Sequence, residues 1–352
     1  MTEFVALLES VGKGDVEKVG GKCANAGEML KIGIPVPPGF ALTTIVYNTF
    51  LSQTGAQEEI EAFLNRFSEW PKTLAQCDEV SRALSNIIES KEIPENLVKV
   101  ICSAYRDLCK RTGVSNLAVA VRSSGIAEDM PSVSFAGQYE SYLNVKGEKE
   151  LLKKVKACWA SMFTPRAISY RMHHNMGVLA GAISVMVMKM VNVRSAGVAF
   201  TAETVTGDRA KIVVDGNWGA GESVVQGIVN PDHYVIDKET LRIVERQISK
   251  KERYYALTEG GTEQKEIDQD KQGIPCISNE EAIKIAELAK RIEECYGQPQ
   301  DLEWAIDQKL AYPSNVFLVQ TRPVTALVEK KSTVEIVLDQ MLSRVYHTKF
   351  VR

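Results

Sequence analysis

Hydrophobic and polar residues repeat with two different periods along the chain, and the change between them predicts a mixed α+β protein. In the first half, apolar residues recur at helical spacing. The helices expected from this spacing cover residues 23–32, 43–52, 57–111 with breaks at Pro71 and Pro94, 148–162 and 165–176. Beyond residue 182, short apolar runs separated by glycine and polar turns are typical of strands. The expected strands lie in the segments AISVMVMKMV, AGVAFTA, AKIVVDG and HYVID.

The last third of the chain returns to helical spacing and then to strands. Residues 241–275 are polar and include the turn Gly260-Gly261, which predicts an exposed hairpin or excursion. A helix is expected over residues 279–296. Two strands should follow it, over residues 301–307 and 316–321.

The shift in composition near residues 180–195 predicts a boundary between two lobes. We expect a first lobe over residues 1–190, a second over residues 191–327 and a tail over residues 328–352. A chain of 352 residues can bury a core in each lobe. A cleft between the lobes is then available for a ligand.

Charge and cysteine usage argue against several classes of protein. The chain has 42 Lys and Arg against 45 Asp and Glu, and no block of basic residues, so neither nucleic acid nor a membrane surface is an expected partner. Its 7 cysteines form no CxxC pair and predict neither a zinc site nor a disulfide framework. The N-terminus lacks a signal-peptide pattern, and no apolar run is long enough to span a membrane. We therefore expect a cytoplasmic location.

Residues 122–145, which read RSSGIAEDMPSVSFAGQYESYLNV, combine a basic residue, hydroxyls and glycine in one stretch. An apolar run precedes them and an alternating run ends them, which predicts strand, exposed loop and strand. In this interpretation Arg122 ends the first strand. The loop holds Ser123, Ser124, Ser134, Gly137 and Ser141. Such a loop can bind the phosphates of a nucleotide.

Two segments near the C-terminus predict a cluster of oxygen ligands and an arginine. Residues two apart in a strand face the same side, so Asp301 and Glu303 should lie together, as should Gln320 and Arg322. If the two strands are antiparallel neighbours, one face gathers all four side chains. Magnesium prefers such oxygen ligands, and a guanidinium fits the transferred or bridging phosphate of ATP. Spacing alone also allows a surface salt-bridge cluster.

Two further features fit a nucleotide but have ordinary alternatives. Lys22 follows Gly20-Gly21 where a loop meets a helix N-terminus, a position that favours anions. No Walker A motif is present, and a solvated lysine is the alternative. The run at residues 183–191 contains Met188, Lys189 and Met190, and an adenine ring could lie against it. Methionine-rich strands are more often part of a core.

No histidine in the chain has the surroundings of a phosphorylated residue. The four histidines are His173, His174, His233 and His347, and none lies in a segment rich in glycine and hydroxyls. Structural or surface roles are expected for them. A second loop, residues 218–227, carries glycines and Glu222 and is a weak signal by itself.

Taken in order, these motifs resemble the N-terminal nucleotide-binding domain of the phosphoenolpyruvate synthase, pyruvate phosphate dikinase and rifampicin phosphotransferase family. The resemblance covers about residues 15–327 and rests on VGGKCANAGEM, PVPPGF, the segment 122–145, SAGVAFTAE, WGAGESVVQGIVNPD, QDLEWAID and VFLVQTRPVTAL. It implies an ATP-grasp fold, in which two α+β lobes clamp Mg-ATP.

The resemblance also implies roles for individual residues. Phosphate contacts are implied for Lys22, Arg122 and Arg322, a nucleotide-covering loop for Gly137 and Ser141, metal binding for Glu303 and Gln320, and a supporting or second-metal carboxylate for Asp301. Met188 stands where relatives often have a glutamine near the nucleoside. Only a backbone contact is therefore implied there.

In this family ATP yields AMP and phosphate while the β-phosphoryl group passes to a histidine in a TSH motif and then to an acceptor. The present sequence lacks that motif. We therefore expect the ATP-binding catalytic subunit of a split dikinase, using ATP and Mg²⁺, with a partner subunit that carries the histidine and the acceptor-binding domains. Pyruvate, and phenol as in phenylphosphate synthase, are equal candidates for the acceptor, and rifampicin ranks below them. A fragment of a longer enzyme, or a nucleotide-binding regulatory protein without phosphotransfer, is the alternative.

Overall fold

The computed structural model describes residues 3–66, 73–126, 129–130, 133–134, 140–173, 177 and 181–324. The described helices are α1 (Val16–Lys31), α2 (Thr44–Thr54), α3 (Ala56–Leu64), α4 (Leu74–Ser90), α5 (Glu95–Thr112), α6 (Glu148–Ala160), α7 (Pro165–His173), α8 (Glu222–Val225) and α9 (Asn279–Tyr296). The described strands are β1 (Val5–Leu7), β2 (Gly39–Leu42), β3 (Val119–Gly125), β4 (Asp129–Met130), β5 (Val133–Ser134), β6 (Ser141–Val145), β7 (Ile183–Lys189), β8 (Val193–Phe200), β9 (Lys211–Trp218), β10 (Asp232–Asp237), β11 (Ile243–Gln247), β12 (Arg253–Thr258), β13 (Gly261–Glu266), β14 (Gln300–Asp307) and β15 (Val316–Pro323). The fold is therefore α+β, as expected.

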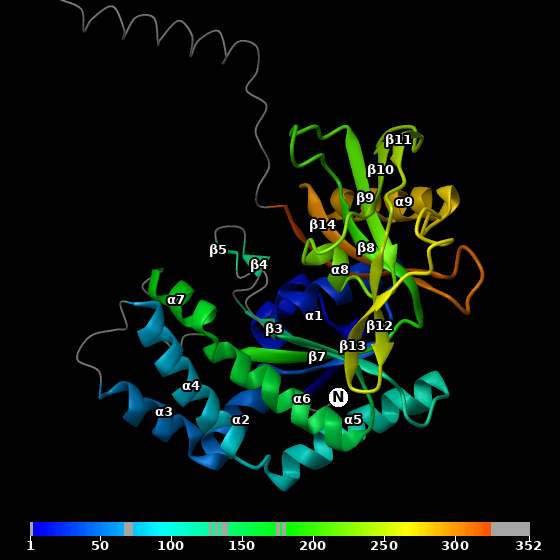
Figure 1. The fold of residues 1–352 in the computed structure, drawn as a ribbon. Coiled ribbons are helices and arrows are strands. Elements are labelled where there is room, and N and C mark those ends of the chain that lie inside the picture. Colours follow the sequence, from blue (N-terminus) through cyan, green and yellow to red (C-terminus); the bar gives the residue numbers. More distant parts are fainter. Residues whose placement is uncertain are drawn as a thin grey trace, which may run out of the picture.

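The N-terminal sheet has the strand order β1-β2-β7-β3-β6 among the described residues, and its neighbouring strands are antiparallel. Helices α2 to α6 cover one face, and α1 lies on the other (Figure 1). The face covered by α2 to α6 includes packed aromatic residues, and the rings of Phe50 and Trp159 are centred 4.7 Å apart. Burying each such side chain stabilises the fold by about 1.5–3 kcal/mol.

The C-terminal sheet has the order β11-β10-β9-β8-β14-β15 in the described part of the chain. Helix α9 covers one face, and its apolar residues share a core with α1 and with both sheets. Residues 190–192 connect β7 of the first sheet to β8 of the second. The boundary at residue 190 stays a proposal. Helix α1 precedes that boundary and yet packs on β15 of the C-terminal sheet, so the two parts share packing. The proposed tail, residues 328–352, lies outside the described residues.

Local signals explain where several elements begin and end. Helix α9 starts at a capping box, in which the Ser278 side chain accepts a hydrogen bond from the Glu281 N–H and the Glu281 carboxylate accepts one from the Ser278 N–H. It ends at Gly297, whose φ of 68° is left-handed. The polar segment expected as an excursion forms β11 and the hairpin β12–β13. In the ranges that the structure covers, no helix combines the length and apolarity of a membrane span.

Candidate functional site

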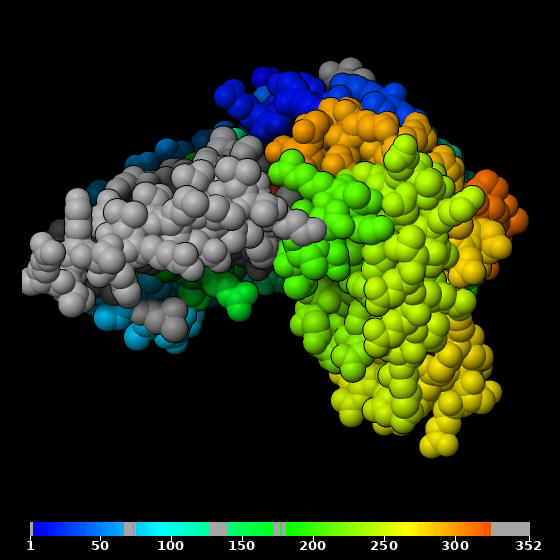
Figure 2. All heavy atoms as spheres, turned by 90° about the horizontal axis from the view of Figure 1, so that it is seen from above, coloured from blue at the N-terminus to red at the C-terminus, as the bar shows by residue number. Residues whose placement is uncertain are grey.

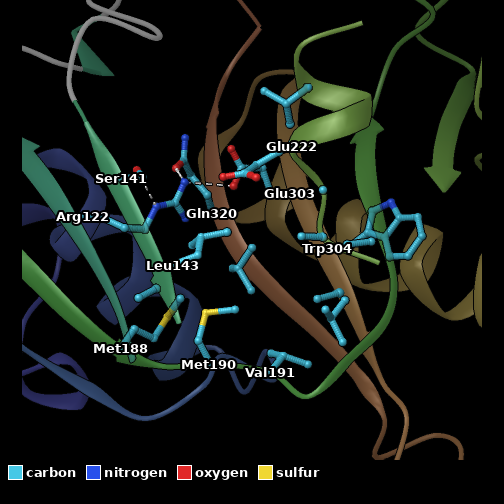
Figure 3. A pocket seen from close by; sticks show the side chains of 18 of the residues that line it. Arg122, Ser141, Leu143, Met188, Met190, Val191, Glu222, Glu303, Trp304 and Gln320 are labelled. Atoms are coloured by element: carbon cyan, nitrogen blue, oxygen red, sulfur yellow. Dashed lines mark hydrogen bonds and ion pairs between the residues drawn. The ribbon is translucent and has the colours of Figure 1, made fainter. Parts of the chain in front are cut away.

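A pocket of about 820 Å³ lies between the two sheets. Its walls come from β3, β6 and β7 on one side and from β8, β14 and β15 on the other, and the α8 segment closes part of the rim. Figure 3 shows Arg122 pointing from β3 toward Glu303 and Gln320 of the opposite wall. Two strands that belong to different sheets therefore present charged groups to the same space.

Lys22 reaches the pocket because helix α1 is interrupted at Gly20. Gly20 has φ 71° and ψ 169°, a conformation that breaks the helix and that glycine adopts without strain. The Ser124 hydroxyl spans the break by donating to the Val19 carbonyl and accepting from the Cys23 N–H. Lys22 is then 7% exposed, and its Nζ donates to the Ser123 carbonyl oxygen at 2.9 Å. The lysine is fixed rather than solvated.

Arg122 lies in the middle of β3, which corrects the expectation that it ends the strand. The strand continues to Gly125 because both serine hydroxyls are satisfied inside the protein: that of Ser123 donates to the Glu140 carbonyl, and that of Ser124 binds α1. Arg122 itself is 8% exposed. Its Nε donates to the Ser141 hydroxyl at 3.3 Å.

One terminal nitrogen of Arg122 bridges to the opposite sheet. It donates to Glu303 Oε2 at 3.0 Å and to Gln320 Oε1 at 2.6 Å. Strands β14 and β15 are antiparallel neighbours with Glu303 opposite Gln320, so the pairing expected from the sequence is present. A bulge follows Glu303 in β14 and changes the register toward β15. The two oxygens therefore converge on a single cationic nitrogen.

Asp301 and Arg322 form the next cross-strand pair. The Nε and a terminal nitrogen of Arg322 both approach Asp301 Oδ2, at 2.8 and 2.6 Å. Burial raises the pKa of Asp301 above its ordinary value, Arg322 opposes this rise, and the nearby Glu303 carboxylate adds to it. The predicted group of two carboxylates, an amide and a guanidinium is thus assembled on one sheet.

The other end of the pocket is apolar. Met188, Met190 and Val191 line it where the chain passes from β7 toward the C-terminal sheet, with Leu143 of β6 nearby (Figure 3). Met188 is also part of the core shared with α1. It therefore serves the packing role that methionine-rich strands usually have and still borders the pocket.

The sequence interpretation missed Arg166, an exposed residue of α7 that lines the pocket. It stands in the first turn of its helix, where a positive charge is unfavourable to the helix dipole. That misplaced charge was the signal that could have indicated it. Glu222, expected only as a weak signal, also lines the pocket from α8.

Two groups of predicted residues lie elsewhere. Gly137 falls outside the described residues, as do His174 and His347. His233 lies on β10 opposite Asp215 of β9, and its Nδ1 is 2.6 Å from Asp215 Oδ1. The hydrogen bond with Asp215 raises the pKa of His233. Neither residue of this pair is among those that line the pocket.

Comparison with known proteins identifies the family. A family model described as "Pyruvate phosphate dikinase, AMP/ATP-binding domain" matches residues 16–341. The chain belongs to this family. A probable phosphoenolpyruvate synthase of Methanothermobacter thermautotrophicus is 39% identical over 336 residues, which make up 96% of this chain and 48% of that protein. A probable phosphoenolpyruvate synthase of Staphylothermus marinus is 42% identical over an alignment of 351 residues that covers 93% of this chain and 42% of that protein.

The phosphoenolpyruvate synthase of Aeropyrum pernix is 40% identical over an alignment of 361 residues that covers 94% of this chain and 43% of that protein. The chain thus spans less than half the length of these three relatives. Their similarity extends over the AMP/ATP-binding domain and assigns this chain to that part of the family's enzymes.

The oxygen atoms of this AMP/ATP-binding domain fit a magnesium ion carried by a nucleotide. Glu303 and Gln320 aim two hard oxygen donors at one point, now taken by the Arg122 nitrogen. The described residues contain no group of three or more His, Cys, Asp or Glu side chains suited to a metal. Magnesium is often held by one or two protein oxygens together with phosphate oxygens and water. The donor set therefore fits a metal that phosphates help to hold.

Proposed function

We propose that this chain binds Mg-ATP in an ATP-grasp arrangement between its two sheets and catalyses the first half of a dikinase reaction. ATP and water yield AMP and phosphate, while a histidine nitrogen outside this sequence receives the β-phosphoryl group. The observation that carries the proposal is the meeting of Arg122, Glu303 and Gln320 across the pocket.

The walls of the pocket suggest how the nucleotide lies. The adenine ring would occupy the apolar end at Met188 and Val191, and the phosphates would extend toward the charged end. There Lys22, Arg122 and Arg322 supply positive charge, and fixed charges of this kind stabilise a migrating phosphoryl group without reorganisation.

Arg122 would exchange partners when the nucleotide binds. In the present structure its guanidinium neutralises Glu303. A phosphate offers the same nitrogen a stronger and better-matched acceptor. Glu303 and Gln320 would then be free to hold Mg²⁺, which would polarise the phosphate oxygens. Asp301 keeps Arg322 directed along the strand edge.

We propose that the acceptor histidine comes from outside this sequence, because no histidine in the chain lies in a segment rich in glycine and hydroxyls. Among the four histidines, His233 is paired with Asp215 and lies away from the residues that line the pocket. We propose a histidine-bearing partner with acceptor-binding domains. The names of the relatives favour pyruvate as the final acceptor, and no relative named above supports phenol.

The test is transfer of label from ATP. The chain is incubated with ATP labelled at the β-phosphorus and with its histidine-bearing partner, or with the C-terminal remainder of the Aeropyrum pernix relative as a substitute. We expect AMP, phosphate and an acid-labile label on the partner, with none on a partner whose histidine is changed to alanine. ATP binding without AMP or label, with either partner, would contradict the dikinase and leave the regulatory nucleotide-binding alternative.

A further inference from the structure

The hairpin β12–β13 connects the two sheets beside the pocket. Its six residue pairs run from Arg253 opposite Glu266 to Thr258 opposite Gly261. In Figure 1 it extends from the C-terminal sheet toward the N-terminal sheet, where both of its strands contact β6. In Figure 2 the yellow-green and yellow atoms, which include the hairpin, gather on one side of the molecule. The hairpin therefore contacts both sheets and does more than cover the surface of one of them.

One buried carboxylate fixes both ends of the excursion that contains the hairpin. Asp232 Oδ1 accepts from the Ser249 N–H at 3.1 Å and from Lys251 Nζ at 2.5 Å, just before β12. Its Oδ2 accepts from the Cys276 N–H at 2.7 Å, where the chain returns from the excursion shortly before α9. Asp232 and Lys251 are fully buried, and a buried ion pair strongly resists loss of either partner. Asp232 of β10 therefore anchors the chain just before the hairpin.

The tip of the hairpin is tied to the N-terminal sheet. Asn144 of β6 donates from Nδ2 to the Thr258 carbonyl at 2.5 Å. Asn144 has φ 56°, a left-handed conformation that asparagine tolerates better than most residues. Strand β13 also packs against β6. Strand β6 in turn carries Ser141, the hydroxyl that contacts Arg122.

Between its base and its tip, the hairpin contacts the α8 wall of the pocket, by which we mean α8 and the residues just before it, 219–221. The Ala220 N–H donates to the Tyr255 carbonyl at 2.8 Å, and Gly219 forms a bridge with the same residue. Thr262 Oγ1 donates to Glu222 Oε2 at 2.5 Å. Ala220, Gly221 and Glu222 all line the pocket. The hairpin thus satisfies polar groups of the pocket wall.

We propose that hairpin β12–β13 is a strap that sets the position of the α8 wall, and that Thr262 is a positioning residue for the Glu222 carboxylate. The pocket contains two arginines and a lysine that the proposed function assigns to phosphate, Arg122, Arg322 and Lys22. A glutamate released from Thr262 can turn toward these cations and neutralise them. By holding Oε2, Thr262 keeps the positive charge available for ATP. This inference rests on the proposed function.

The test compares two substitutions of Thr262 with a neighbouring control. Thr262→Val keeps the shape and removes the donor, Thr262→Ser keeps the hydroxyl, and Glu263→Gln alters an exposed residue of the same strand. We expect Thr262→Val to raise the ATP KM for AMP formation about tenfold, as the loss of a hydrogen bond to a charged group implies. The serine variant and the control should stay within about twofold of the wild type.

A double variant separates positioning from a merely structural role. If the freed carboxylate causes the effect, Thr262→Val should change little in a Glu222→Gln background, since the glutamine no longer neutralises arginines. An equal tenfold increase in both backgrounds would overturn the role of Thr262. So would a wild-type KM for Thr262→Val.

Hydrogen exchange of the nucleotide-free protein tests the strap independently of catalysis. We expect Thr262→Val and Asn144→Gly to increase exchange in residues 219–226 while α9 stays protected. Unchanged exchange there in both variants would overturn the strap. If the wild type binds ATP but forms no AMP, the proposed function fails, while the exchange result still decides whether the hairpin fixes the wall.

Discussion

The two walls of the pocket differ in how their charged groups are held. On the N-terminal side, Lys22 and Arg122 are almost fully buried and are held by uncharged oxygens of their own wall, the Ser123 carbonyl and the Ser141 hydroxyl. On the C-terminal side, Glu303 and Arg322 are more open, with side chains 25% and 34% exposed. The first wall holds its cations in fixed positions. The charged groups of the second wall are paired with other charged groups, Glu303 with Arg122 and Arg322 with Asp301.

From this difference we infer which contacts would change when a nucleotide binds. The cations of the first wall stay in place because neutral oxygens from β3 and β6 hold them. The ion pair that joins Arg122 to Glu303 across the pocket is a contact that a phosphate can replace. In the proposed function, Glu303 and Gln320 of the C-terminal wall would therefore exchange the Arg122 nitrogen for a metal.

The largest expected effect comes from breaking the open wall at Arg322. We expect Arg322→Ala to lower kcat for AMP formation by about 10²–10³-fold, because charge develops on the phosphoryl group only during transfer. Affinity for ATP should fall much less, since Lys22 and Arg122 remain. Rates of AMP formation and calorimetric binding of ATP measure the two quantities separately.

Two controls sharpen the Arg322 result. Arg209→Ala removes an exposed arginine that does not line the pocket and should leave the rate unchanged. Arg322→Lys keeps the charge without the two-pronged geometry and should recover only part of it. A wild-type rate for Arg322→Ala would show that the open wall does not act on the migrating group.

The sequence predicted the open wall better than the fixed one. Alternation placed Asp301 and Glu303 on one face, and two strands so close along the chain pair easily, so β14 and β15 were predictable. Helix α9 was predictable from its periodicity, and its capping box and terminal glycine act locally.

The fixed wall depends on contacts between distant segments. Ser124 completes α1 from more than 100 residues away, and this tertiary contact lets β3 continue through two serines that local propensity assigns to a loop. Nor does spacing reveal that Arg122 and Glu303 meet, 181 residues apart. Such contacts follow from the packing of the two sheets and from no local pattern.

The fixed wall can be broken at Gly20. A Cβ on this residue would lie 2.0 Å from the Ser124 carbonyl oxygen, in a left-handed backbone. Gly113→Ala is a control for a positive φ in open space, since Gly113 has φ 70° and ψ 20° with nothing within 4 Å of its added Cβ. We expect Gly113→Ala to lower the free energy of unfolding by about 1–2 kcal/mol. Gly20→Ala should cost about 1–3 kcal/mol more, because the backbone of β3 must move and because a φ of 71° with ψ 169° is open essentially to glycine alone.

Urea unfolding measures both variants, and calorimetry then shows whether ATP binding follows. A displaced Lys22 should weaken ATP binding in Gly20→Ala only. Equal stability losses in the two variants would mean that the junction between α1 and β3 yields easily and that the first wall is not fixed.

The smallest expected effect distinguishes the walls most directly. Glu303→Gln removes the carboxylate that both pairs with Arg122 and is proposed to bind Mg²⁺. We expect Mg²⁺ to tighten ATP binding about tenfold less in this variant than in the wild type, a difference of about 1.4 kcal/mol. Without Mg²⁺, ATP should bind at least as tightly as to the wild type, because Arg122 is no longer neutralised.

These opposite signs separate a metal ligand from a structural ion pair. Titration calorimetry with and without Mg²⁺ gives both affinities, and Glu239→Gln, a change of the same charge at an exposed site, controls for net charge. If Glu303 only braced the two sheets, its loss would weaken ATP binding equally in both conditions. If Mg²⁺ tightened ATP binding as much in Glu303→Gln as in the wild type, the metal would bind other oxygens. The ion pair of Arg122 and Glu303 would then serve only to join the two walls.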